Sequence, residues 1–177
     1  MTVVIAAPPL HTISLLVRNQ PGVLVRVALV FARRGYNIES LVVCPVFGDK
    51  RAEELGETFS RMTITCSGDP ETLEQIIKQL EKLIDVVHAI DHTGQAVIET
   101  EIALLKVKAA LKERTEILQI AEHYHAKVVD YGPDSLIVRV EGESDKLDAL
   151  IGLLKPFAIV ELVRSGKILM ARGMETT

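Results

Sequence analysis

The chain of 177 residues contains one order of predicted elements twice, and this repeat limits the folds open to it. The order is strand, helix, strand, strand, helix, strand. Apolar residues alternate with polar ones in the predicted strands and recur at i, i+3, i+4 and i+7 in the helices. Such a unit forms a two-layer sandwich in which both helices cover one face of an antiparallel sheet. We therefore predict an α+β chain built from two ferredoxin-like βαββαβ sandwiches.

The first sandwich is predicted over residues 9–93. Its strands are expected at residues 11–18, 39–46, 59–66 and 84–90. The first helix follows Pro21, which suits the first helical position, and ends at Gly35. The second begins at Pro70 behind Asp69, a residue type that caps helix N-termini. Residues 47–57 are charged and contain two glycines, which predicts a mobile loop.

The second sandwich is predicted over residues 94–173. Its strands are expected at residues 101–107, 127–131, 136–140 and 159–170, the last one broken near Gly166. One helix begins near Glu113, and Ser144 is expected to cap the other. The two halves differ in spacing by about 17 residues, largely because the 47–57 loop has only a short turn as its counterpart. Residues 92–97, with Gly94, are the predicted boundary.

The composition argues against several classes of partner. A net charge of −4 disfavours nucleic-acid binding, which needs a basic face. Aromatic residues make up 4% and tryptophan is absent, so stacking platforms are not expected. No apolar run reaches the length of about 18 residues that a membrane span needs. The mean hydropathy of +0.26 instead indicates apolar surface buried against another subunit. The chain has only two cysteines, Cys44 and Cys66, which favours a reducing cytosol.

The sequence offers little for catalysis or metal binding. It contains no G-x-S-x-G elbow, no G-x-G-x-x-G fingerprint and no P-loop. His123 and His125 form an H-x-H at a predicted helix end, which we interpret as a solvated terminus because further ligands are not nearby in sequence. His88 and His92 are expected at the surface. We therefore predict no catalytic residue and no metal site in this chain.

Residues 19–24, with the sequence N-Q-P-G-V-L, form the most informative segment. They place a strand end, a glycine and a helix N-terminus within six residues. Free backbone N–H groups and the helix dipole favour a carboxylate there, and Gly22 permits close approach. The amide oxygen of Asn19 is suited to accept a hydrogen bond from an ammonium group. The alternative is that Asn19 merely caps the helix and Gly22 only shapes the turn.

The chain has only two asparagines, and the second supports a ligand role for the first. Asn37 lies between the first helix and the second strand, so within one domain it is expected at the opposite end of that helix from Asn19. Both amides can contact one ligand only if two subunits bring opposite ends together. This arrangement predicts an effector site at a dimer interface.

Several blocks of the sequence resemble the small regulatory subunit of acetolactate synthase, also called acetohydroxyacid synthase. The resemblance covers nearly the whole chain, and R-G-Y-N-I-E-S-L is its most specific block. The N-x-x-G turn is shared by many ACT domains and is less specific. The matching blocks are residues 19–24, 33–41, 60–63, 73–80 and 160–166, continuing to Arg172-Gly173.

This resemblance implies an N-terminal ACT domain that binds valine at a homodimer interface, and a C-terminal ACT-like domain. Backbone amides of Gly22 and Val23 are then expected to hold the valine carboxylate. Asn37 and Ile38 of the neighbouring subunit are expected to provide an amide and an apolar wall. The expected effector-binding residues are Asn19, Gly22, Val23, Leu24, Asn37 and Ile38.

The resemblance also implies a catalytic partner. The large subunit of this family uses thiamine diphosphate, Mg²⁺ and FAD to condense two pyruvates, or pyruvate with 2-oxobutyrate (EC 2.2.1.6). This chain is expected to hold none of these cofactors, to activate that subunit and to make it sensitive to valine. The expected compartment is the bacterial cytoplasm, or the plastid stroma for a plastid-encoded chain.

Two other classes of function remain open on the residues themselves. The chain would be a stand-alone amino-acid-sensing ACT protein if it regulates a different enzyme. It would be a small α+β enzyme if the purified chain turned over a substrate unaided. Copurification with a large thiamine-dependent subunit distinguishes the regulatory subunit from both.

Overall fold

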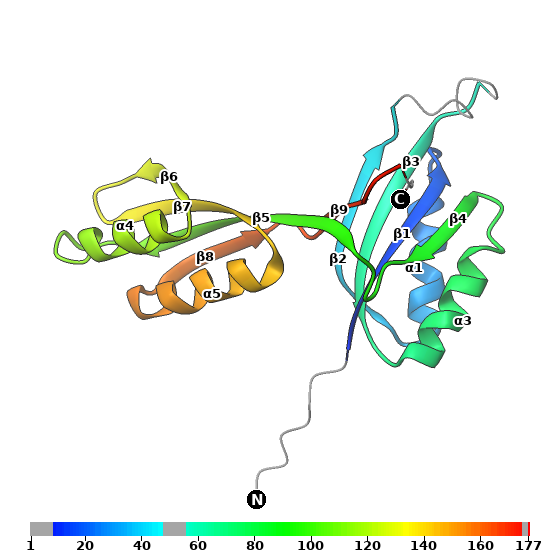
Figure 1. The fold of residues 1–177 in the computed structure, drawn as a ribbon, viewed down its shortest axis with the longest axis horizontal. Coiled ribbons are helices and arrows are strands. Elements are labelled where there is room, and N and C mark those ends of the chain that lie inside the picture. The colour runs from blue at the N-terminus through cyan, green and yellow to red at the C-terminus, as the bar shows by residue number, and fades with distance from the viewer. Residues whose placement is uncertain (1–8, 48–55, 175–176) are drawn as a thin grey trace, which may run out of the picture. The chain divides into compact units, whose positions relative to one another are not determined.

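A computed structural model describes residues 9–47, 56–174 and 177 (Figure 1). The N-terminal elements follow the predicted order. They are β1 (Leu10–Arg18), α1 (Val23–Arg33), β2 (Asn37–Pro45), β3 (Phe59–Ser67), α3 (Pro70–Leu80) and β4 (Val86–Asp91). The sheet has the strand order β2-β3-β1-β4, and every neighbouring pair is antiparallel. Helices α1 and α3 lie together on one face of it (Figure 1). The first predicted ferredoxin-like sandwich is thus confirmed.

The second half repeats this topology. Its elements are β5 (Val97–Lys108), α4 (Arg114–His123), β6 (Lys127–Tyr131), β7 (Ser135–Gly142), α5 (Ser144–Leu154), a 3-10 turn (Lys155–Phe157), β8 (Ile159–Arg164) and β9 (Ile168–Ala171). The strand order β6-β7-β5-β8 matches that of the first sheet, and β9 also pairs with β5. The predicted break in the last strand separates β8 from β9. The α+β fold class with two ferredoxin-like units is therefore confirmed.

Contacts between Cα atoms divide the chain into two compact units. The first ends at Val97 and also includes the segment from Leu169 onward, and the second spans Ile98–Ile168. Each unit has a core of its own, in which aliphatic residues of the central strands pack against the apolar stripes of two helices. The domain limits 9–93 and 94–173 stay a prediction. The predicted loop at 47–57 falls largely on residues 48–55, outside the described residues.

The helix starts were predicted with mixed success. Asp69 caps α3 as predicted, because its carboxylate accepts a hydrogen bond of 2.8 Å from the Thr72 N–H, and Pro70 is the first helical residue. Hydrogen bonding to the Thr72 side chain, followed by the bond from the Thr72 N–H, lowers the pKa of Asp69. In contrast, Ser144 does not cap α5. The N-cap residue is Glu143, whose side chain makes no capping bond. The Ser144 hydroxyl instead donates to the carboxylate of Glu101 on β5.

The prediction of a surface position for His92 is wrong. Its side chain is only 5% exposed, and its Nε2 and Nδ1 lie 2.7 Å from Ser14 Oγ and 3.1 Å from Gln95 Oε1. The cause is tertiary: the backbone N–H of His92 donates to Thr12 of β1, which folds the residue over the sheet. His88 is partly exposed.

Three further observations concern classes that the sequence disfavoured. Among the described residues, no helix combines the length and the apolar character needed to cross a membrane. In the same part of the chain, no three His, Cys, Asp or Glu side chains are grouped closely enough to hold a metal ion. Cys66 is also unsuited to act as a nucleophile: burial raises the pKa of its thiol to about 11, so the thiol stays protonated at neutral pH.

Candidate functional site

The turn between β1 and α1 leaves the start of the helix open. Helix α1 begins at Val23, two residues later than the sequence predicted, and its N-cap residue is Gly22 with a left-handed φ of 84°. Pro21 lies in the turn before it. The N-cap position is occupied by Gly22, so Asn19 is not the N-cap residue of this helix. Gly22 is required by the backbone here, since L-residues are strained at this φ.

Backbone N–H groups at this helix start remain available. The Val23 N–H makes a long turn bond of 3.4 Å to the Gln20 carbonyl, and the Arg26 N–H donates to the Gly22 carbonyl. Among the described residues, no backbone acceptor faces the N–H groups of Gly22 and Leu24. Unpaired amides at the positive end of a helix are suited to bind a carboxylate. Of the expected pair, the Gly22 N–H has no described backbone acceptor and the Val23 N–H makes the long turn bond.

Arg26 adds a positive charge at this position, which the sequence analysis missed. A Cβ placed on Gly22 would lie 3.3 Å from Arg26 Nη1. The other side of this guanidinium is held by Asp85, whose Oδ2 is 2.7 Å from both Nε and Nη2 and whose side chain is buried. The only sequence signal for this role of Arg26 was its spacing of four residues from Gly22, which places the two residues on one helix face. The helix start therefore combines open amides with a fixed cation.

The remaining expected residues of this turn contribute in different ways. The backbone N–H of Asn19 donates to Thr58 at 2.8 Å, which fixes the backbone at the end of β1. Val23 is buried in the core, so its side chain is not available to a ligand. Leu24 is exposed and extends an apolar surface from the helix start.

Asn37 and Ile38 lie at the opposite end of the sheet from Asn19. Strand β3 shows this directly: Phe59 pairs with Arg18 at one end of the strand, and Ser67 pairs with Asn37 at the other. Eight residue steps at about 3.3 Å place the two ends about 26 Å apart. A single chain therefore does not bring both asparagines to one small ligand.

The Asn37 side chain is oriented by Glu39. Its Nδ2 donates to Glu39 Oε1 at 3.0 Å, and the Ser67 hydroxyl donates to the same oxygen at 2.9 Å. These bonds lower the pKa of Glu39, so the carboxylate is ionised at neutral pH. With its N–H₂ group bound to Glu39, the amide oxygen of Asn37 is the group left to accept a hydrogen bond from a ligand. Ile38 is half-buried and packs against the core.

The corresponding helix start in the second unit has a different construction. Helix α4 begins with Arg114, a buried residue whose Nε and Nη2 donate to the carbonyls of Ala109 (3.1 Å) and Gly132 (2.8 Å). Its guanidinium also lies over the ring of Tyr131, 4.7 Å from the centroid. This arginine ties the end of β5 and the turn between β6 and β7 to the start of the helix. The two helix starts thus differ in what holds their arginine, which is a carboxylate for Arg26 and backbone carbonyls for Arg114.

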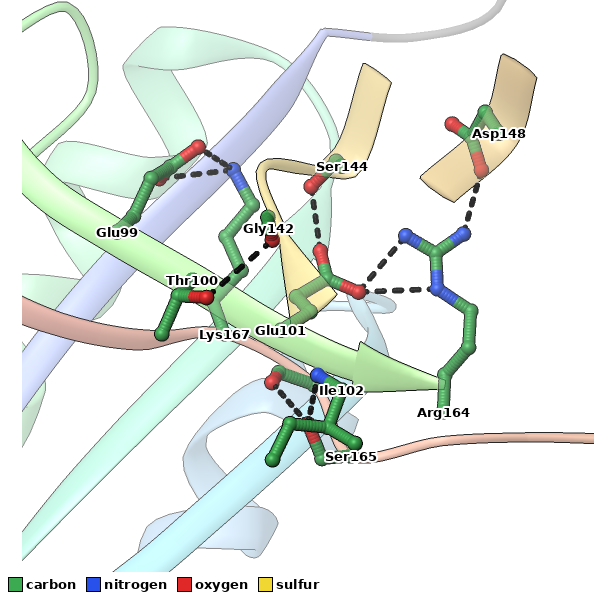
Figure 2. Close-up of polar contacts among 11 residues, drawn as sticks. Glu99, Thr100, Glu101, Ile102, Gly142, Ser144, Asp148, Arg164, Ser165 and Lys167 are labelled. Atoms are coloured by element: carbon green, nitrogen blue, oxygen red, sulfur yellow. Dashed lines mark hydrogen bonds and ion pairs between the residues drawn. The ribbon is translucent and has the colours of Figure 1, made fainter. Parts of the chain in front are cut away.

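The second unit also contains a polar cluster in which each charge has a partner (Figure 2). Glu101 of β5 is 5% exposed and accepts from Arg164 of β8 through Nε at 2.9 Å and Nη2 at 2.7 Å. Arg164 also donates to Asp148 of α5 at 2.6 Å. Burial disfavours the charge of Arg164, but its bonds to the two carboxylates outweigh this and raise its pKa. The cluster joins β5, α5 and β8, and we assign it a structural role.

Comparison with known proteins agrees with this two-unit architecture. A family model described as the AHAS small subunit-like ACT domain matches residues 13–88, and a model described as the small subunit of acetolactate synthase matches residues 100–173. A probable acetolactate synthase small subunit of Archaeoglobus fulgidus is 45% identical over 92% of this chain and 97% of its own length. The acetolactate synthase small subunit of Mycobacterium bovis is 42% identical over 94% of this chain and 95% of its own length.

Solved structures give the same result. The crystal structure of the acetolactate synthase small subunit from Thermotoga maritima superposes with a TM-score of 0.78 at 35% identity. The alignment covers 93% of this chain and 98% of that one. Full-length similarity in sequence and in fold is thus observed with proteins of the same name from archaea and bacteria. We conclude that this chain belongs to the family of acetolactate synthase small subunits.

Proposed function

We propose that this chain is a non-catalytic regulatory subunit that activates the acetolactate synthase large subunit and makes it sensitive to valine. Its family membership supports a large catalytic partner. The observation that favours amino-acid sensing is the open start of α1, where Gly22, unpaired amides and Arg26 are suited to bind a carboxylate. The proposed pathway is the biosynthesis of valine, leucine and isoleucine.

The sheet topology explains how a dimer would complete this site. Strand β2 is at one edge of the first sheet, and β1 and β2 are parallel because both are antiparallel to β3. If two β2 edges pair antiparallel about a two-fold axis, the start of one β2 meets the end of the other. Asn37 of the partner subunit then lies at the same end of the sheet as Asn19 and Gly22. We propose that one ligand bridges the two asparagines at this end of the joined sheet.

The surface beside β2 is apolar, which suits such an interface. Helix α1 packs against β2, whereas α3 packs against β4. The core side of α1 is buried, yet its other side is also apolar and is exposed. The exposed apolar residues on α1 and β2 are Leu24, Val25, Leu29 and Val43. Exposed apolar stripes of this kind mark contacts with another chain.

In this dimer each polar group of valine has a suitable partner. The carboxylate is bound by the open amides of Gly22 and Leu24 next to Arg26. The ammonium group donates to the amide oxygens of Asn19 and of Asn37 of the partner subunit. A ligand with so few atoms is expected to bind between millimolar and micromolar concentrations, which suits a sensor of a metabolite pool.

Binding across two subunits offers a route to regulation. Valine would stabilise one relative packing of the two first sheets, and a coupling of about 1–3 kcal/mol is enough to change activity 5- to 150-fold. The chemistry is proposed to stay in the large subunit with its thiamine diphosphate, Mg²⁺ and FAD. We propose the cytoplasm as the compartment, with the plastid stroma applying to a plastid-encoded chain.

The first test is calorimetric titration of the purified chain with valine, using alanine as the control ligand. Saturable binding at about one site per chain supports the proposal, and assays with the large subunit then measure activation and inhibition. Turnover by the small chain without a large subunit would contradict the non-catalytic assignment. Activation of an unrelated enzyme would instead favour a stand-alone amino-acid sensor.

Leu29→Asp is expected to convert the dimer to a monomer, because it buries a carboxylate in the proposed α1–β2 interface. Light scattering after gel filtration measures the mass directly. Leu153→Asp on α5 is the matched control, since Leu153 is similarly exposed but lies in the second unit. If Leu29→Asp leaves a dimer, or if a monomer binds valine with full affinity, the bridging arrangement is wrong.

Asn37→Ala is expected to weaken valine binding about tenfold, the effect of losing one hydrogen bond to a charged group. The variant chain should still be a dimer, because the amide contributes little to the apolar contact. Calorimetry gives the affinity, and thermal unfolding serves as the control for folding. An unchanged valine affinity would remove Asn37 from the site.

A further inference from the structure

A pocket lies in the first unit, on the sheet face that α1 and α3 do not cover. Its volume is about 260 Å³, and its lining residues come from the end of β1 and the beginnings of β3 and β4. These residues are Leu16, Arg18, Glu57, Phe59, Ile84, Val86 and Val87.

The floor of the pocket is apolar, and its two largest buried side chains lie outside the main core. Leu16 and Phe59 are only 4% and 3% exposed, yet neither belongs to the core cluster under the helices. At the rim, Ile84 is 84% exposed and Val87 is also exposed. Two buried large side chains on the uncovered face, with open apolar residues beside them, form a site for an apolar group.

The mouth of the pocket has one charge of each sign. Arg18 Nε lies 3.2 Å from Glu57 Oε2, and about a third of each side chain is exposed. This contact uses one atom of each group. Among the described residues, the Arg18 Nη atoms and Glu57 Oε1 have no further partner. A ligand carboxylate can bind at the guanidinium and a ligand ammonium at the free carboxylate oxygen without breaking the existing pair.

We infer that this pocket binds an apolar α-amino acid in its zwitterionic form, at a site separate from the start of α1. The neighbouring cation and anion match the two charges of the ligand, and the apolar floor accepts its side chain. The volume lies slightly below the range of about 300–1,000 Å³ that is typical of ligand sites, which favours a small ligand. An aliphatic side chain inserted by a partner protein would make no use of the two charges at the mouth, so the pair favours a zwitterion as the occupant.

The inference can be tested by methyl NMR on the full-length chain, with L-leucine as the probe. We expect saturable shifts of the methyl resonances of Ile84, Val87 and Leu16. Isoamylamine lacks the carboxylate and isovalerate lacks the ammonium group, so each is expected to bind at least tenfold more weakly. Shifts of the Leu24 and Ile38 methyls report the proposed interface site separately, which distinguishes failure of one site from failure of the other.

Glu57→Gln is the informative variant, because it removes the negative charge and keeps the shape of the side chain. It is expected to weaken L-leucine binding in the pocket at least tenfold, while Glu71→Gln on α3 serves as the matched control. Three results would overturn the inference: no shift of the pocket methyls, equal binding of isoamylamine, or unchanged affinity in Glu57→Gln. Broadening of the pocket methyls only when the large subunit is added would instead identify a protein contact.

Discussion

Gly22→Asp is expected to abolish valine inhibition while the chain still activates the large subunit. The new carboxylate would lie where the ligand carboxylate is proposed to bind, next to Arg26 Nη1, which is 3.3 Å from the position of the added Cβ. It would therefore take the ligand's place on the cation and repel valine. Losing one or two charge-assisted hydrogen bonds, at about 1.5–3 kcal/mol each, corresponds to inhibition weakened from roughly 10-fold to more than 10,000-fold.

Gly22→Ala is the matched control for backbone strain. The φ of 84° is unfavourable for any L-residue, at a cost of about 1–2 kcal/mol, but alanine adds no charge. Inhibition curves at increasing valine concentration should show a small effect for alanine and a large one for aspartate. Equal curves for the two variants would assign the effect to strain, and an unchanged curve for aspartate would remove Gly22 from the site.

Arg164→Met is expected to produce the largest loss of stability in the second unit. Without the guanidinium, the carboxylate of Glu101 remains buried with only the Ser144 hydroxyl as a described partner (Figure 2). A buried charge that loses its partner typically costs about 3–5 kcal/mol, and the partial exposure of Arg164 reduces this to about 2–4 kcal/mol. Urea unfolding followed by far-UV circular dichroism measures the change, since the chain has no tryptophan.

Two variants test whether burial of Glu101 is the cause. Lys106→Met removes an ion pair to Glu161 between the same two strands, but that pair is exposed, so a much smaller shift of the unfolding midpoint is expected. Glu101→Gln combined with Arg164→Met should recover a large part of the lost stability, because a neutral amide is less costly to bury than a carboxylate. Equal midpoints for the two single variants would contradict this explanation.

Periodicity and helix-terminal residues predicted the elements of this fold because these signals act within a few residues. Alternation and β-branched composition identified the strands of the described residues, with ends that differ from the structure by a few residues. Asp69 and Pro70 marked the start of α3 correctly, since a cap and its N–H donor are three residues apart. The prediction that Ser144 caps α5 was wrong, because its hydroxyl bonds to Glu101, which is distant in the sequence.

The sequence by itself therefore determined the α+β class, the doubled βαββαβ order and the family resemblance, and it predicted the effector site at Gly22. The tertiary structure alone decided which distant side chains meet. It buried His92 against Ser14, placed Arg26 between Gly22 and Asp85, and gathered Leu16 and Phe59 around a pocket. These contacts depend on strand register and helix docking, which join residues dozens of positions apart and leave no periodic trace in the chain.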